Sequence, residues 1–122
     1  MKASGRRTAA QVKGCAAEEA AARFLSRKGL QVLARNYRTR LGEIDLVARE
    51  GETLVFVEVR LRSSARFGGA AESVDPRKRM RIASAARHFL ARLGREPACR
   101  FDVVTLDGDD VGEWLRGAFE TA

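Results

Sequence analysis

The sequence predicts one α/β domain, and three observations carry that prediction. The chain has 122 residues, a length that suits a single folded unit. Hydrophobic residues make up 45% and charged residues 32%, which is typical of a globular protein rather than a disordered one. Helical and extended patterns follow in the order helix, three strands, helix, strand, helix. We therefore expect one domain over 1–122, with 1–10 as a flexible basic arm.

The first predicted element is a helix from Thr8 to Lys28, a stretch rich in alanine and free of proline. Gly29 ends it. Its apolar stripe is expected to comprise residues spaced four apart: Val12, Ala16, Ala20 and Phe24.

Three extended runs come next, from Leu30 to Tyr37, from Glu43 to Ala48 and from Leu54 to Leu61. A basic connection, 38–40, separates the first from the second. The second and third runs predict a hairpin, because Glu50-Gly51-Glu52 supplies a turn between them.

A second long helix is predicted to start at Asp75 and Pro76, with Asp75 as the N-cap and Pro76 at the first helical position. It is expected to run to Leu93, before the break at Gly94 to Pro97. Its buried face should carry Ile82, Ala86, Phe89 and Leu93.

The last part of the chain predicts one strand and one helix. Arg100 to Leu106 alternates and indicates a strand, and Asp107-Gly108-Asp109 indicates a turn. Val111 to Phe119 is then expected to form a short terminal helix.

The charge of the chain indicates a polyanionic partner. Lysine and arginine total 23 against 16 acidic residues, which gives a net charge of +7 and a pI near 10.4. A genome that prefers arginine codons would explain why arginine outnumbers lysine, but not the net charge. On the second long helix, one polar row either follows phosphates or is an ordinary solvated face: Arg77, Arg81, Ser84, His88 and Arg92.

Several classes of protein are excluded. Cys15 and Cys99 lack a CxxC spacing and have one histidine, His88, to join them, so a zinc site is not expected. No apolar run approaches the ~18 residues of a membrane span. Glu18 and Glu19 interrupt what would be the apolar core of a signal peptide. The expected location is the cytoplasm, without a membrane partner.

The predicted hairpin brings acidic residues together. Glu43 and Asp45 share one face of the first strand, because strand side chains alternate between faces. A loop over 50–53 would place Asp45 opposite Glu58, with Cβ atoms about 5 Å apart. Glu43, expected as a supporting residue, would then face Arg60.

This pair of carboxylates has two interpretations. Glu58 interrupts an apolar strand, where an ionised carboxylate is costly and a second one adds repulsion. A divalent cation such as Mg²⁺ would remove both costs. Alternatively, Arg60 forms a salt bridge with Glu58 or Glu43 at the edge of the sheet.

Glu18 is a candidate third member of this site. It shares a helix row with Ala21, Ala22 and Leu25, so it either points inward or is simply a solvated charge. A metal here would imply hydrolysis of a phosphodiester, with Arg60 stabilising the developing charge. Arg60 cannot be the general base, because guanidinium stays protonated.

A family resemblance covers nearly the whole chain after residue 10. The residues that carry it are Gly14…Glu18-x-x-Ala21…Leu25, Gly29-Leu30, Asn36, Gly42-Glu43-Ile44-Asp45-Leu46, Val55-Phe56-Val57-Glu58-Val59-Arg60, Lys78 and Arg100-Phe101-Asp102-Val103-Val104. In combination they resemble the YraN family, small bacterial proteins related to Holliday-junction resolvases. The resemblance implies a restriction-endonuclease-like α/β fold, in which a mixed central sheet is flanked by helices.

The resemblance also implies a metal site of the D…(E)xK type. Carried over by position, the catalytic residues are Glu18, Asp45, Glu58 and Arg60, with Mg²⁺ or Mn²⁺ on Asp45 and Glu58. Arg60 stands where the motif more often has lysine. Lys78 either offers a replacement amine or is a solvated helix charge.

Three functions follow from these patterns. The first is a metal-dependent, structure-specific DNA endonuclease that acts on branched or processed DNA. The second is a non-catalytic nucleic-acid-binding protein on the same fold, with Glu58 and Arg60 as a structural ion pair; the third is a protein-interaction adaptor. Junction resolvases need two active sites, which favours a homodimer. The residues expected to contact nucleic acid are Arg62, Arg66, Arg77, Lys78 and Arg81, and the loop 63–69, with Phe67 stacking on a base or packing, is expected to close over the backbone.

Overall fold

The computed structural model describes residues 9–61, 74–108 and 110–120. Its strands form one mixed sheet in the order β1-β2-β3-β4-β5, in which β3 and β4 are parallel and the other neighbours antiparallel. The elements are α1 (Ala9–Arg27), β1 (Gln31–Arg38), β2 (Glu43–Glu50), β3 (Thr53–Leu61), α2 (Pro76–Leu93), β4 (Cys99–Asp107) and β5 (Asp110–Phe119).

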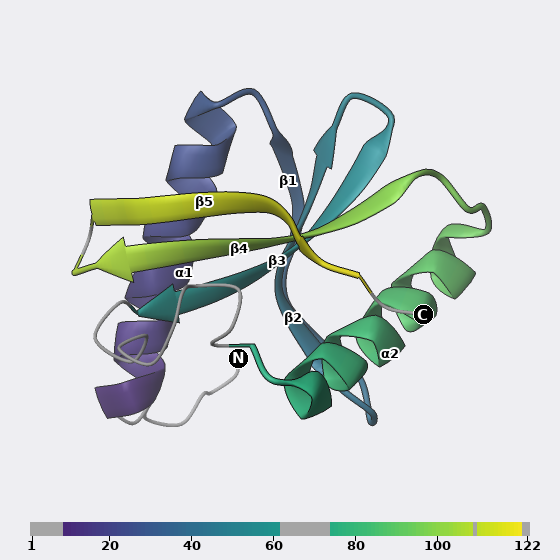
Figure 1. The fold of residues 1–122 in the computed structure, drawn as a ribbon, viewed down its shortest axis with the longest axis horizontal. Helices are drawn as coiled ribbons and strands as arrows, with labels where there is room; N and C mark the ends of the chain where they lie inside the picture. Colours follow the sequence, from purple (N-terminus) through teal and green to yellow (C-terminus); the bar gives the residue numbers. More distant parts are fainter. Residues whose placement is uncertain (1–8, 62–73, 109, 121–122) are drawn as a thin grey trace, which may run out of the picture.

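The two helices cover opposite faces of this sheet (Figure 1). One core lies between α1 and the sheet and includes Leu25, Leu46 and Val104. The other lies between α2 and the sheet and includes Phe56 and Ile82. The central strands are covered on both faces, and for this reason their sequences are apolar at nearly every position instead of at every second one. The parallel pair β3 and β4 is joined through α2, as a parallel connection requires.

The predicted hairpin is present with the expected register. Arg49 pairs with Leu54, and Val47 pairs with Phe56. Gly51 adopts φ 61° in the turn, a conformation that glycine enters at little cost. The pairing of Asp45 with Glu58 lies one position beyond the last paired residues and is described with the site.

The second helix also begins and ends as predicted. The Asp75 side chain accepts a hydrogen bond from the Lys78 backbone N–H at 2.8 Å, and Pro76 occupies the first turn. Gly94 ends the helix in the left-handed conformation, with φ 80°. The predicted buried face is correct at Ile82, which is buried, but wrong at Leu93, which is 38% exposed.

The terminal helix predicted for Val111 to Phe119 is wrong, because these residues belong to strand β5, antiparallel to β4. Without β5, the backbone N–H and C=O groups along one edge of β4 would have no strand to pair with. The two strands are joined through Gly108, which has φ 61°, and irregular pairing bends β5 along its length. Gly112 and Gly117, which disfavour a helix, were the signals in the sequence.

The apolar stripe predicted for α1 is only partly correct. Ala16 is exposed, whereas Ala20 is buried and Phe24 is half-buried. The buried row instead includes Ala17, Ala21 and Leu25. The helix is rotated in this way because the small side chains, which allow close approach, face the sheet.

The turn between β1 and β2 packs directly on α2. A Cβ added to Gly42 would lie 1.9 Å from the backbone oxygen of Arg81, so only glycine fits there. Thr39 shapes the turn, since its Oγ1 accepts the backbone N–H groups of Leu41 and Gly42. This contact fixes the start of β2 relative to α2.

Some predictions fall outside the described residues, namely those for Arg62, Arg66, the loop 63–69 and residues 1–8 of the basic arm. Residues 9 and 10 of that arm belong instead to α1. Over the part of the chain that the structure describes, neither helix combines the length and apolar character needed to cross a membrane.

Candidate functional site

Asp45 and Glu58 meet where β2 and β3 separate, in agreement with the predicted register. Backbone pairing of the two strands ends at Leu46 and Val57. Just beyond, the Val59 backbone N–H donates a 2.8 Å hydrogen bond to Oδ2 of Asp45. The carboxylate of Asp45 thus accepts a backbone donor at the point where pairing between the strands has ended.

Glu58 is a buried carboxyl group beside a second one. Its side chain is 4% exposed. Burial raises its pKa to about 8, and the negative charge of Asp45, together with a hydrogen bond to it, acts in the same direction. Lys78 and Arg60 oppose this shift. Glu58 therefore holds a proton near neutral pH unless another cation takes its place.

Glu18 reaches Asp45 from α1, on the other side of the site. Burial and the charge of Asp45 raise the pKa of Glu18 to about 7, against a hydrogen bond with Asn36 that lowers it. Its row neighbours Ala21 and Leu25 are fully buried, so the inward orientation is the correct one. Asp45 consequently lies between two carboxyl groups, each of which is harder to ionise because of it.

Asn36 is a site residue to which sequence reasoning assigned no role. It has φ 51°, the only positive φ outside glycine among the described residues. Asparagine tolerates this conformation better than most residues. The pairing of β1 with β2 is also irregular, between Val32 and Ala34. Asn36 could have been found in the sequence as a polar residue inside a run that is mostly apolar and basic.

Two cations flank Glu58 from different elements. Nε of Arg60, on β3, lies 3.7 Å from Oε2 of Glu58. Nζ of Lys78, in the first turns of α2, lies 3.8 Å from the same oxygen. The exposed fractions of the two side chains are similar, 29% and 27%. Lys78 therefore belongs to this cluster, as one of the two interpretations of the sequence expected.

Glu43 is placed differently from the other acidic residues. It pairs with Arg38 in the ladder between β1 and β2. Pairing between β2 and β3 stops at Leu46, so Glu43 and Arg60 are not paired across the hairpin. The expectation that Glu43 faces Arg60 is wrong for the backbone ladder, because the strands have already separated.

The donor set fits a hard divalent cation such as Mg²⁺. Among the described residues, no group of three or more His, Cys, Asp and Glu side chains is spaced to hold a metal ion. Mg²⁺, however, commonly takes one or two protein carboxylates together with water and phosphate oxygens. Asp45 and Glu58 supply such a pair, and their mutual repulsion is a cost that Mg²⁺ or Mn²⁺ would remove.

Basic side chains continue from this site along α2. Arg77 and Arg81 are exposed, and so is Arg92 further along the helix. His88 of the same predicted row contacts β1, because its Nδ1 lies 2.6 Å from the hydroxyl oxygen of Tyr37. The arginines thus form an exposed basic surface that begins beside Lys78.

A second polar centre surrounds Asp102, a residue to which the sequence patterns assigned no role. Asp102 on β4 is fully buried. It accepts hydrogen bonds from Arg100 Nε at 2.9 Å, Trp114 Nε1 at 2.9 Å and the Gly117 backbone N–H at 3.0 Å. Arg100 also donates to Glu50 at 2.8 Å, and this pairing keeps the pKa of Glu50 below its usual range. The cluster fastens β5 to β4, which is a structural role.

The mixed sheet between two helices defines the chain as an α/β protein with a restriction-endonuclease-like fold. It belongs to the YraN family, described as uncharacterised protein family UPF0102, which matches residues 17–106. A UPF0102 protein of Cupriavidus taiwanensis is 55% identical over 111 residues, covering 90% of this chain and 84% of that protein. Another, of Ralstonia nicotianae, is 56% identical over 115 residues, covering 90% and 88%. A third, of Burkholderia thailandensis, is 57% identical over 110 residues, covering 89% and 76%.

Proposed function

We propose that the protein is a metal-dependent, structure-specific DNA endonuclease that acts on branched or processed DNA. The observation that carries the proposal is the position of Asp45 between Glu18 and Glu58, with Lys78 beside Glu58. A fold gains nothing in stability from three carboxyl groups gathered in this way. Groups with strongly shifted pKa values in such a cluster are typical of a functional site.

Each residue of the cluster has a separate role in the proposed reaction. Asp45 and Glu58 would hold Mg²⁺ or Mn²⁺, which when bound polarises a phosphoryl oxygen and makes water more acidic. Arg60 and Lys78 would neutralise charge that develops on the phosphate. Glu18 hydrogen-bonds Asp45 and orients it.

The charge of the chain supports the proposed substrate class. The net charge is +7, and Arg77 and Arg81 extend the cationic surface along α2 from Lys78. Contacts of this kind bind phosphates without reading base sequence. The exposed arginines therefore favour recognition of a DNA structure over recognition of a base sequence.

The second candidate function is a nucleic-acid-binding protein without catalysis. The contact between Nε of Arg60 and Oε2 of Glu58, at 3.7 Å, favours it, because Arg60 and Lys78 partly offset the burial of Glu58 and require no metal. Binding would then be sensitive to salt and independent of divalent ions. Catalysis would be absent under every metal condition.

A cleavage assay separates the two candidates. Labelled four-way junction, flap, single-stranded and duplex DNA would be incubated with Mg²⁺, Mn²⁺ or EDTA. Asp45→Asn and Glu58→Gln keep side-chain size and remove charge, and Glu52→Gln, at an exposed position in the β2–β3 turn, is the matched control. We expect cutting by wild type and Glu52→Gln only, and none in EDTA. Binding without cutting in all conditions would support the second candidate instead.

The proposal includes two copies of the chain on a junction, since cutting two strands requires two sites. Sedimentation of the protein on four-way junction DNA would measure this stoichiometry. One copy for each junction, together with cutting of single strands only, would limit the activity to flaps or nicks.

A further inference from the structure

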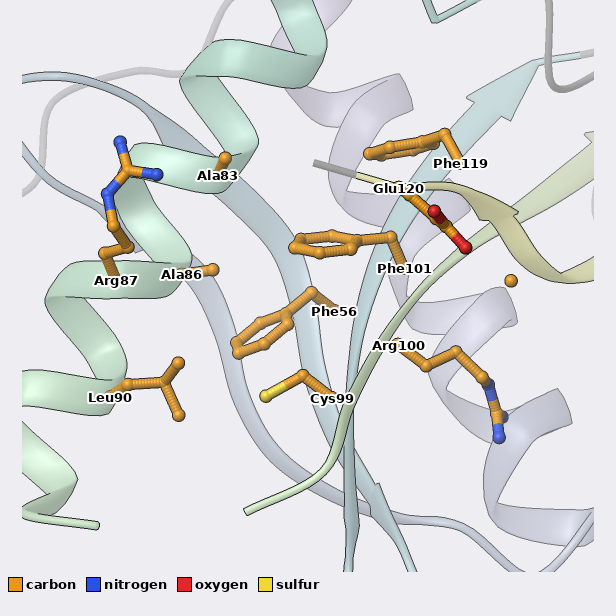
Figure 2. A pocket seen from close by; sticks show the side chains of 11 residues that line it. Phe56, Ala83, Ala86, Arg87, Leu90, Cys99, Arg100, Phe101, Phe119 and Glu120 are labelled. Atoms are coloured by element: carbon orange, nitrogen blue, oxygen red, sulfur yellow. The ribbon is translucent and has the colours of Figure 1, made fainter. Parts of the chain in front are cut away.

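A cavity of about 490 Å³ lies between the second half of α2 and the β4 and β5 side of the sheet. Figure 2 shows Phe56, Phe101 and Phe119 extending from the strands toward α2, with Ala83 and Ala86 opposite them. Its volume lies within the ~300–1,000 Å³ of small-ligand pockets. The small alanine side chains leave a slot where larger residues would complete the core.

The aromatic wall presents ring edges to this slot. Phe101 is stacked between Phe56 and Phe119, with ring centroids 5.5 and 5.2 Å away and planes inclined by 30° and 23°. Both faces of Phe101 are therefore covered, and its edge remains. Ring edges carry partial positive charge and attract the face of another aromatic ring. An alkyl chain would gain no such interaction, so the wall favours a planar aromatic group.

The mouth of the cavity carries charged groups of both signs. Arg87 is exposed, and its Nη2 donates a 3.3 Å hydrogen bond to Ser84 Oγ. Arg100 also lines the cavity, but Asp102 and Glu50 already accept its hydrogen bonds. Arg87 is thus suited to an anionic group, while the exposed carboxylate of Glu120 can accept from a ring N–H.

We propose that this slot binds one nucleobase, with the phosphate of the same nucleotide on Arg87. An aromatic ring with N–H donors and a nearby phosphate matches the wall and both charges at the mouth. A second copy of the chain is disfavoured as the occupant, because each copy carries a net charge of +7. The nucleotide can come from solution or from an unpaired position in a strand.

An unpaired base of a DNA strand in the slot would link the slot to the carboxylate cluster. Only this part of the proposal rests on the proposed function. Phe56 and Glu58 are two positions apart on β3, and both contact α2. Along α2, Ala86 lies eight positions after Lys78, which is a rise of about 12 Å. An unpaired base in the slot would therefore place a phosphate one or two nucleotides away near Glu58.

The test uses Cys99, an exposed thiol that lines the cavity. In a Cys15→Ser protein, Cys99 is the remaining thiol, and its alkylation by iodoacetamide would be timed in EDTA. We expect deoxynucleoside monophosphates to slow the reaction several-fold and saturably. Deoxyribose 5-phosphate and inorganic phosphate should not. A blunt hairpin DNA and the same hairpin with one unpaired base distinguish the strand source from the free nucleotide.

Two variants make the test specific. Arg87→Ala should weaken protection about tenfold, as expected for one lost charge-assisted hydrogen bond. Arg27→Ala, at an exposed position at the end of α1, is the matched control and should leave protection unchanged. Asp45→Asn should also protect normally, since Asp45 does not line the cavity.

Three results would overturn the proposal. One is the absence of protection by every nucleotide and by both hairpins. Another is equal protection by phosphate alone, which would reduce the site to an anion contact. The third is alkylation that slows with protein concentration alone, which would assign the slot to a second copy. Cleavage that persists despite any of these would leave the proposed function intact.

Discussion

Removing the carboxylate of Asp102 should destabilise the protein more than any exposed substitution. Its two oxygens accept hydrogen bonds from Arg100, Trp114 and Gly117, and its side chain is fully buried. Asp102→Ala would leave the Arg100 guanidinium without its main partner and Trp114 Nε1 without an acceptor. Breaking a buried ion pair in this way costs about 3–5 kcal/mol.

The expected loss can be expressed as a change in melting temperature. Unfolding entropy is about 2.1 cal/mol/K for each residue, which for 122 residues makes about 0.26 kcal/mol/K. A loss of about 4 kcal/mol therefore lowers the Tm by about 15 °C. Urea unfolding, followed by the fluorescence of Trp114, would give the same free energy independently.

The matched control is Asp110→Ala, at an exposed position where β5 begins. It should change the free energy of unfolding by less than about 0.5 kcal/mol. Hydrogen exchange adds a local readout, because the Gly117 N–H should lose protection in Asp102→Ala. A fall of less than about 1 kcal/mol in the free energy of unfolding for Asp102→Ala, or unchanged exchange at Gly117, would refute the role of Asp102 in holding β5 against β4.

Three further predictions concern the site. In EDTA, the free energy of unfolding should fall as pH rises from about 5 to 8. The reason is that glutamate in the unfolded chain, with a pKa of 4.5, loses its proton before folded Glu58, whose pKa is about 8. Urea melts of Glu58→Gln should show a flatter pH profile, and an equally steep one would contradict the assignment. Gly42→Ala should cost about 2–3 kcal/mol in thermal melts, since its Cβ would lie 1.9 Å from the Arg81 oxygen, and a near-neutral effect would mean that α2 shifts freely. Lys78→Met should lower the proposed cleavage about 100-fold while Lys28→Met leaves it unchanged, and equal rates would remove Lys78 from the reaction.

The central part of the fold could be predicted because its signals are local. The turn 50–52 fixes the register of β2 and β3, and Asp75 with Pro76 fixes the start of α2. Each of these rests on a few neighbouring residues whose conformational preferences agree with the tertiary structure. The sequence was sufficient there for the same reason that such segments fold reliably.

Strand β5 could not be predicted in the same way, because its structure depends on partners distant in the chain. Apolar residues at Val111, Leu115 and Phe119 match a helical period as well as a bent strand. What decides between them is the open edge of β4 and the need of buried Asp102 for donors from Trp114. That requirement is visible only once Asp102 is known to be buried.

The carboxylate cluster depends on a defect in the sheet, which explains why its members could be found and its geometry could not. Alternation along the strands was enough to place Asp45 beside Glu58. The end of backbone pairing between β2 and β3, at Leu46 and Val57, is a tertiary feature that alternation along the strands does not predict. Because the strands part there, the Asp45 carboxylate can accept the Val59 N–H and still face Glu18 and Glu58.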